Sequence, residues 1–140
     1  MNTANLSVIE SICKNLLDDF HGMLSWKWDD WIGTILAEFD AGESADVRAL
    51  LDKYLPVSWE SANITTAPDI VQKLDRHLGG LRPTQFLFSS DPSSDDFVFC
   101  AWWPWGNQAN ISLRVGILSQ DMSKEDDEKF NKRIRVWAGI

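Results

Sequence analysis

The chain has 140 residues, a formal net charge of −8 and an apolar share of 44%. A chain of this length is the size of one domain and can bury about two thirds of its unfolded surface. The apolar share excludes an intrinsically disordered protein. We therefore expect a single domain over 1–140, with a mainly helical, acidic part at 1–80, a β-meander at 81–120 and a C-terminal helix at 121–140.

The negative charge lies in the first half of the chain. Residues 1–70 contain twelve acids and four bases, whereas residues 71–140 contain nine of each. An acidic surface repels nucleic acids and anionic membranes and attracts basic partners. No stretch reaches the roughly 20 apolar residues of a membrane span, and the first residues lack the pattern of a signal peptide. We expect a cytoplasmic protein that binds neither nucleic acid nor membrane.

Four helices are predicted in the first part. Apolar residues recur at helical spacing from Leu6 up to a stop at Gly22. A second helix is expected from Ser25 to Gly42, because Trp28, Trp31 or Ile32, Ile35 and Phe39 share one helical stripe. The third is bounded by Ser44 and Pro56, and the fourth by Thr66 and Gly80. The segment "VSWESANITT" between the last two is predicted to be a loop or a short extended piece.

After Gly80 the apolar period changes from that of a helix to that of a strand. The segments "QFLFSS", "DFVFCAWWPW" and "NISLRVGIL" predict three strands of an antiparallel meander, with turns between them. The middle strand is apolar on both faces, so we expect its second face to be covered. Pro104 removes a ladder donor, which favours a hairpin tip that is not paired on both sides.

The last segment predicts a helix that starts at Ser123, with acids early and bases late. The sequence therefore predicts an α+β fold in which about four N-terminal helices pack on one face of a three-stranded antiparallel meander, followed by a C-terminal helix.

No catalytic signature stands out, and we predict a protein that is not an enzyme. His21 and His77 each end a predicted helix, and Cys13 and Cys100 have no neighbouring histidine or CxxC spacing. Adjacent carboxylates on a helix point about 100° apart and do not converge on one substrate atom. We expect no metal site and no cofactor.

Eight tryptophans form two clusters, at 26–31 and 102–105, with two single residues elsewhere. Most of them should be core residues, but at least one in each cluster should be partly exposed. Exposed tryptophans beside acids are typical of protein interfaces. The residues predicted to contact a partner are Trp26, Asp29, Asp30, Asp95, Asp96, Trp102, Trp105 and Asn107.

These features predict a non-enzymatic protein that binds another protein with a basic surface. In size, acidity and α+β layout the chain resembles the small immunity proteins that bacteria keep against their own secreted toxins. The resemblance implies neutralisation of a basic toxin or effector by direct binding. The alternatives are a small-ligand or carbohydrate module, in which tryptophans stack on a sugar, and a chaperone for a secreted effector. Monomer and homodimer are both compatible with the sequence.

Overall fold

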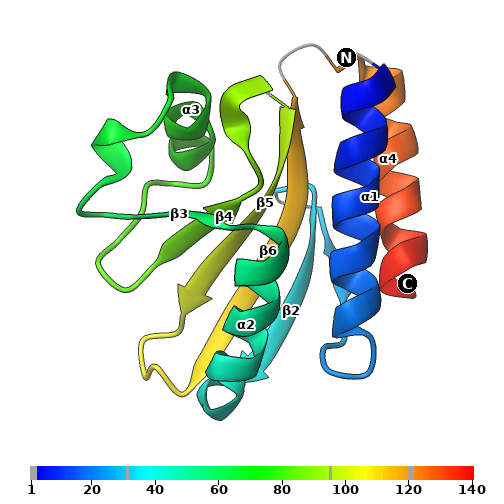
Figure 1. Cartoon of the computed structure of the whole chain (residues 1–140). Helices are drawn as coiled ribbons and strands as arrows, with labels where there is room; N and C mark the ends of the chain where they lie inside the picture. The colour runs from blue at the N-terminus through cyan, green and yellow to red at the C-terminus, as the bar shows by residue number, and fades with distance from the viewer. Residues whose placement is uncertain (1–2, 31, 95, 120–121) are drawn as a thin grey trace.

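A six-stranded antiparallel sheet forms the centre of the molecule, with strand order β1-β2-β6-β5-β4-β3 (Figure 1). The computed structural model describes residues 3–30, 32–94, 96–119 and 122–140. The strands are β1 (Lys27–Asp29), β2 (Thr34–Asp40), β3 (Val57–Glu60), β4 (Phe86–Ser89), β5 (Asp96–Pro104) and β6 (Asn110–Ser119).

The expected three-stranded meander is therefore wrong as a description of the whole sheet. The predicted strands are present as β4, β5 and β6, but β3 extends the sheet beside β4, and the β1–β2 hairpin extends it beside β6. The α+β class is correct. The added strands come from segments far away in the sequence, and their pairing leaves no signal in the local periodicity.

The second predicted helix, from Ser25 to Gly42, is instead this β1–β2 hairpin. Gly33 lies in the turn with φ +78°, and its N–H donates to the carbonyl of Asp29 at 2.9 Å. This left-handed conformation interrupts a helix and is accessible to glycine at little cost. The same apolar residues that fit a helical stripe, Ile35 and Phe39, also alternate in β2, where they face the core.

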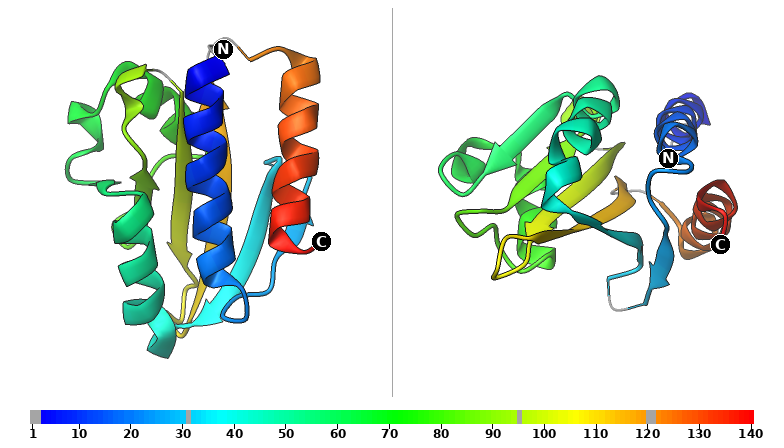
Figure 2. Two further views of the ribbon diagram at one scale, coloured as in Figure 1. Left: turned by 45° about the vertical axis from the view of Figure 1, so that its right-hand side comes forward. Right: turned by 90° about the horizontal axis from the view of Figure 1, so that it is seen from below.

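Three helices cover one face of the sheet: α1 (Thr3–Phe20), α2 (Ser44–Tyr54) and α4 (Lys124–Ala138) (Figures 1 and 2). Their apolar sides share one cluster with the inward residues of β2, β5 and β6. Gly22 follows α1 with φ +82°, and Ser123 caps α4 by accepting the N–H of Asp126 at 3.1 Å. Both predicted helix boundaries are confirmed.

The remaining helix, α3 (Asp69–His77), packs on the opposite face of the sheet (Figure 2). The expectation that all helices lie on one face is therefore wrong. Its buried residues contact Trp59 of β3, Leu87 of β4, and Phe97 and Phe99 of β5. This helix covers the second apolar face of β5 as far as Phe99, so the expected cover is present over the first part of the strand. Fully burying each large aliphatic side chain of α3 contributes about 1.5–3 kcal/mol.

No helix in the described part of the chain is long and apolar enough to cross a membrane.

Candidate functional site

The half of the sheet face that α3 leaves uncovered carries the candidate site. The cluster under α3 includes no described residue of β5 after Phe99. Side chains alternate between the two faces along a strand. The rest of this face is therefore formed by those residues of β1, β2, β5 and β6 that point away from the helix-covered core. We call this surface the open face; it consists of Lys27, Asp29, Leu36, Glu38, Asp40, Trp103, Trp105, Ser112 and Arg114.

An arginine, an aromatic ring and a carboxylate form the centre of the open face. The guanidinium carbon of Arg114 lies 4.6 Å from the ring centroid of Trp103. Its Nε and one terminal nitrogen each lie 3.0 Å from Oδ2 of Asp29. Only 13% of the Arg114 side chain and 16% of the Asp29 side chain are exposed. The pair ties β1 to β6, and it stacks the guanidinium against the indole in a cation–π contact.

Trp105 lies at the tip of the β5–β6 hairpin and is 43% exposed. Its indole Nε1 donates to Oγ of Ser112 at 2.8 Å, and its backbone N–H donates to the carbonyl of Asn110 at 2.9 Å. The first bond uses the indole's polar atom within the chain, which leaves an oriented apolar ring to solvent. A large side chain held in one orientation loses little further conformational entropy when a partner covers it.

Acidic residues flank Trp105. Glu38 is paired across the sheet with Ser112, and Asp40 with Asn110, so both adjoin the residues that Trp105 contacts. Glu43 and Asp46 follow in the sequence but lie at the start of α2, and the sequence contains no lysine or arginine between residues 27 and 48. Among the described residues, no ion pair joins Asp40, Glu43 or Asp46 to a base.

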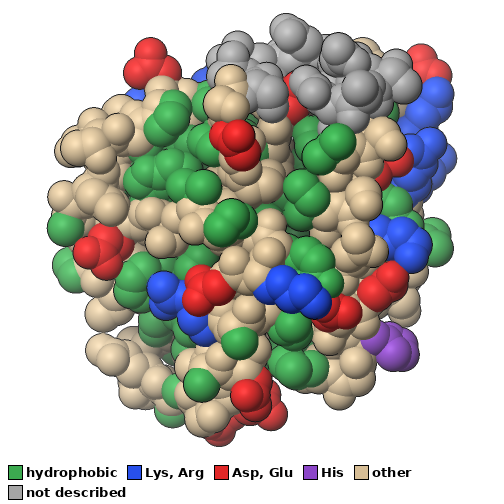
Figure 3. All heavy atoms as spheres, in the orientation of Figure 1, with side chains coloured by type: hydrophobic (Ala, Val, Ile, Leu, Met, Phe, Trp, Pro, Cys, Tyr) green, Lys and Arg blue, Asp and Glu red, His purple; other side chains and the backbone are tan. Residues whose placement is uncertain are grey.

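The helix-covered face contains charges of both signs. Figure 3 shows that acidic and basic side chains lie next to one another there. Ion pairs link Lys14 to Asp18 at 2.8 Å and Lys53 to Asp19 at 3.4 Å. Ion pairs thus neutralise acids on both faces, because Asp29 and Glu38 of the open face are also paired, with Arg114 and Lys27.

Two of the tryptophans predicted to contact a partner are buried. Trp26 is 8% exposed and packs edge-on against Phe20 at 6.1 Å. Trp102 is 5% exposed and packs against Phe39 at 5.3 Å and Phe88 at 6.1 Å. Trp26 was expected at the start of a helix, but its segment is not helical. Trp102 points inward because the alternation of β5 places it opposite Trp103.

The remaining predicted residues lie in different places. Asp29 belongs to the Arg114 ion pair, and the exposed Asp30 accepts a hydrogen bond from the indole of Trp28 at 2.6 Å. Asn107 lies in the hairpin turn, where its Oδ1 accepts the N–H of Ala109 at 3.0 Å. Asp96 begins β5, at the opposite end of the strand from Trp105, and Asp95 lies outside the described residues.

The sequence interpretation missed Trp103, Glu38, Ser112 and Arg114. The alternation of β6 did indicate that Ser112 and Arg114 share the wetter face, and Trp103 had to oppose Trp102 on its strand. These signals could have identified three of the four residues. Glu38 could not be found, because its segment had been assigned to a helix.

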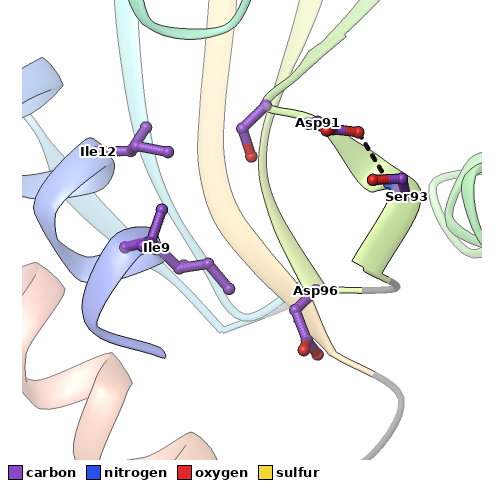
Figure 4. Close-up of a pocket in the computed structure, with 7 residues that line it drawn as sticks. Ile9, Ile12, Asp91, Ser93 and Asp96 are labelled. Carbon is purple, nitrogen blue, oxygen red and sulfur yellow. Dashed lines mark hydrogen bonds between the residues drawn. The ribbon is translucent and has the colours of Figure 1, made fainter. Parts of the chain in front are cut away.

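A second candidate is a cavity of about 210 Å³ between α1 and the segment that joins β4 to β5 (Figure 4). Ile9 and Ile12 face Asp91, Ser93 and Asp96 across it. The polar groups that line the cavity form hydrogen bonds within the chain. Oδ1 of Asp91 accepts the N–H of Ser93 at 2.9 Å, and this bond lowers the pKa of Asp91. Asp96 accepts a hydrogen bond from Ser119. These bonds stabilise the loop that lines the cavity.

Both cysteines of the chain are buried. Burial raises the pKa of the Cys13 thiol to about 12, and it raises that of Cys100 well above its ordinary value. A thiol must ionise to act as a nucleophile, so burial makes both poor ones. No group of three or more His, Cys, Asp or Glu residues in the described part of the chain could hold a metal ion.

Comparison with known proteins finds no family model that matches the chain, no similar curated protein and no similar solved structure.

Proposed function

We propose that this chain binds another protein through the open face, and that the partner is a basic protein such as a toxin or effector that the chain neutralises. The observation that carries the proposal is the exposed indole of Trp105, which Ser112 orients on a sheet face next to acidic residues. The stacked Trp103 and Arg114 provide a rigid surface beside it.

The physical argument begins with the indole. Tryptophan is enriched among the few residues that dominate binding energy, because it removes a large apolar area from water with few rotatable bonds. A standard interface takes about 800 Å² from each partner, which is roughly a tenth of this chain's 7483 Å² surface. The footprint must therefore extend from Trp105 over the neighbouring strands, towards Glu38 and Asp40.

The acidic surroundings indicate the charge of the partner. Glu38 and Asp40 place negative charge on the open face near Trp105, and no lysine or arginine lies between them in the sequence. Such negative charge accelerates encounter with a positively charged surface and disfavours acidic partners. The effect is screened as ionic strength rises, so the association rate should depend on salt.

A carbohydrate site fits these residues less well. A sugar is usually held by aromatic stacking together with free hydrogen-bonding groups around the ring. The amide oxygen of Asn107 is used within the turn, and the indole N–H of Trp105 is used by Ser112. Two polar groups at the hairpin tip are therefore engaged within the chain, which favours a protein partner.

The test is an affinity capture with the tagged full-length chain in an extract of its native cell at low salt, followed by elution with salt. The wild type is compared with Trp105→Ala and with Val136→Ala, a control at an apolar residue of α4 that is 74% exposed. We expect the wild type and the control to retain the same basic protein, and Trp105→Ala to lose it. With the purified partner, a hot spot worth about 2 kcal/mol corresponds to an affinity loss of roughly 30-fold.

Retention of the same partner by Trp105→Ala at unchanged affinity would contradict the proposal. Capture of an acidic protein would contradict the argument from charge. If the wild type captures nothing, a glycan and metabolite screen tests the ligand-module alternative, and a hit lost in Trp105→Ala would replace the proposed function.

A further inference from the structure

The open face contains two units in which a tryptophan lies beside a carboxylate, and only the first has its own arginine. In this unit, the guanidinium of Arg114 stacks on Trp103 and is held by the carboxylate of Asp29. Aromatic stacking and a charge-assisted hydrogen bond thus act on the same cation.

The second unit lies one step along the strands, towards the hairpin tip. Ser112 is paired with Glu38 on one side, and on the other it accepts the indole N–H of Trp105. Directly paired residues on one sheet face have Cβ atoms about 4.5–5.5 Å apart, so the Glu38 side chain adjoins the residue that holds the indole. Asp40 follows two residues later on the same face, where its Oδ1 accepts the N–H of Gly42.

The only base that the described structure pairs with this unit is Lys27, whose Nζ lies 4.0 Å from Glu38 Oε1. Both side chains are exposed, and an exposed pair at this separation contributes little. No described cation stacks on the ring of Trp105. The second unit thus has an aromatic ring, as the first does, and two carboxylates where the first has one, without an arginine between them.

We propose that this second unit binds an arginine side chain of the partner protein, which stacks on Trp105 and pairs with Glu38 and Asp40. The proposal rests on the proposed function, since it names the group of the partner that the open face recognises. A guanidinium suits the unit better than an ammonium does, because it is planar, stacks on an indole and presents a fork of donors to carboxylates. Lysine supplies the charge without the fork.

The test follows the indole N–H resonance of Trp105 by NMR in the ¹⁵N-labelled full-length chain, with the resonance assigned from its loss in Trp105→Phe. The probes are three peptides, acetyl-Gly-X-Gly-amide, in which X is arginine, lysine or citrulline. Citrulline keeps the shape of arginine but carries no charge. We expect the arginine peptide to shift the resonance saturably with a dissociation constant of roughly millimolar order, the lysine peptide to bind several-fold more weakly, and the citrulline peptide to cause no comparable shift.

Two double variants separate local recognition from total charge. Glu38→Gln with Asp40→Asn removes two negative charges at the unit, and Glu125→Gln with Glu128→Gln removes two from exposed positions of α4. We expect the first variant to weaken arginine binding about tenfold and the second to change it less than twofold.

The inference is overturned if the arginine peptide causes no shift, if citrulline shifts the resonance equally, or if the Glu38 and Asp40 variant binds as the wild type does. None of these results affects the capture experiment, in which Trp105→Ala tests partner binding itself. Conversely, a partner retained by Trp105→Ala overturns the proposed function, while the peptide titration still reports the arginine site.

Discussion

Replacing Trp102 by alanine should mainly lower stability, whereas replacing Trp105 by alanine should mainly lower the affinity for a partner. Trp102 is 5% exposed and lies between the rings of Phe39 and Phe88, at centroid distances of 5.3 and 6.1 Å. Its removal leaves a cavity in the core cluster between the sheet and the helices that cover it, and such substitutions cost about 3–5 kcal/mol of unfolding free energy. Trp105→Ala loses partial burial and one hydrogen bond, to Ser112, which is worth about 1 kcal/mol.

The assay is urea and thermal unfolding of both variants beside the wild type. For a domain of this size, each kcal/mol shifts Tm by about 4 °C, so Trp102→Ala should lower Tm by roughly 10–20 °C and Trp105→Ala by about 5 °C or less. Partner affinity should fall in Trp105→Ala. If Trp102→Ala does not fold, Trp102→Phe keeps a ring in the same place and should lose about 1–3 kcal/mol.

Equal destabilisation by the two alanine variants would refute the reasoning, because it would mean that Trp105 is as much a part of the core as Trp102. A loss of unfolding free energy below about 1 kcal/mol for Trp102→Ala would refute the reasoning as well, because removing an indole packed between two rings in the core should cost more than that.

Three other predictions concern packing, pH and reactivity. Gly116→Ala should cost about 1–3 kcal/mol in urea unfolding, since its Cβ would lie 3.0 Å from the Phe99 ring; unchanged stability would contradict this packing. Tyr54 donates to Asp19 and lowers its pKa below the ordinary 3.8. This contribution to stability is present above pH 3.8 and is lost as pH falls through the lowered pKa. Tyr54→Phe should therefore raise the Asp19 pKa in an NMR titration and reduce stability only at pH values above the lowered pKa. An unchanged Asp19 pKa would contradict the role of this hydrogen bond. Cys13, with its pKa raised to about 12, should react with a thiol reagent at about pH 8 only after unfolding, and reaction in the native state would exclude its burial.

The elements that local pattern determines were predictable. In α1 the helical spacing of Ile9, Cys13 and Leu16 coincides with their burial, and in β6 the alternation of Leu113 and Val115 does the same. Each of these segments buries one side, so its period can be read without knowing its neighbours.

The β1–β2 hairpin and β3 were not predictable in the same way. The apolar residues of 28–39 satisfy the helical period and the strand period together, and the choice depends on pairing with β6, more than 70 residues away in the sequence. β3 is an edge strand of four residues, too short for an alternation to identify. The apolar second face of β5 did predict a cover, but nothing in the sequence specified that α3 supplies it.

The candidate site was likewise predictable only where local sequence determines it. Trp105 was identified because Pro104 and the turn residues mark a hairpin tip. Its acidic neighbour Glu38 and the Arg114 pair with Asp29 come from β2, β6 and β1, and the strand register that joins them is a property of the folded sheet.

The most direct test of partner binding through the open face is amide hydrogen exchange of the chain with and without its captured partner. We expect the partner to slow exchange in the β5–β6 turn at 105–110 and along β2 at 36–40, and to leave the helix-covered face at α1 and α2 unchanged. Slowed exchange confined to α1, α2 or α4, with the hairpin tip unaffected, would contradict the account.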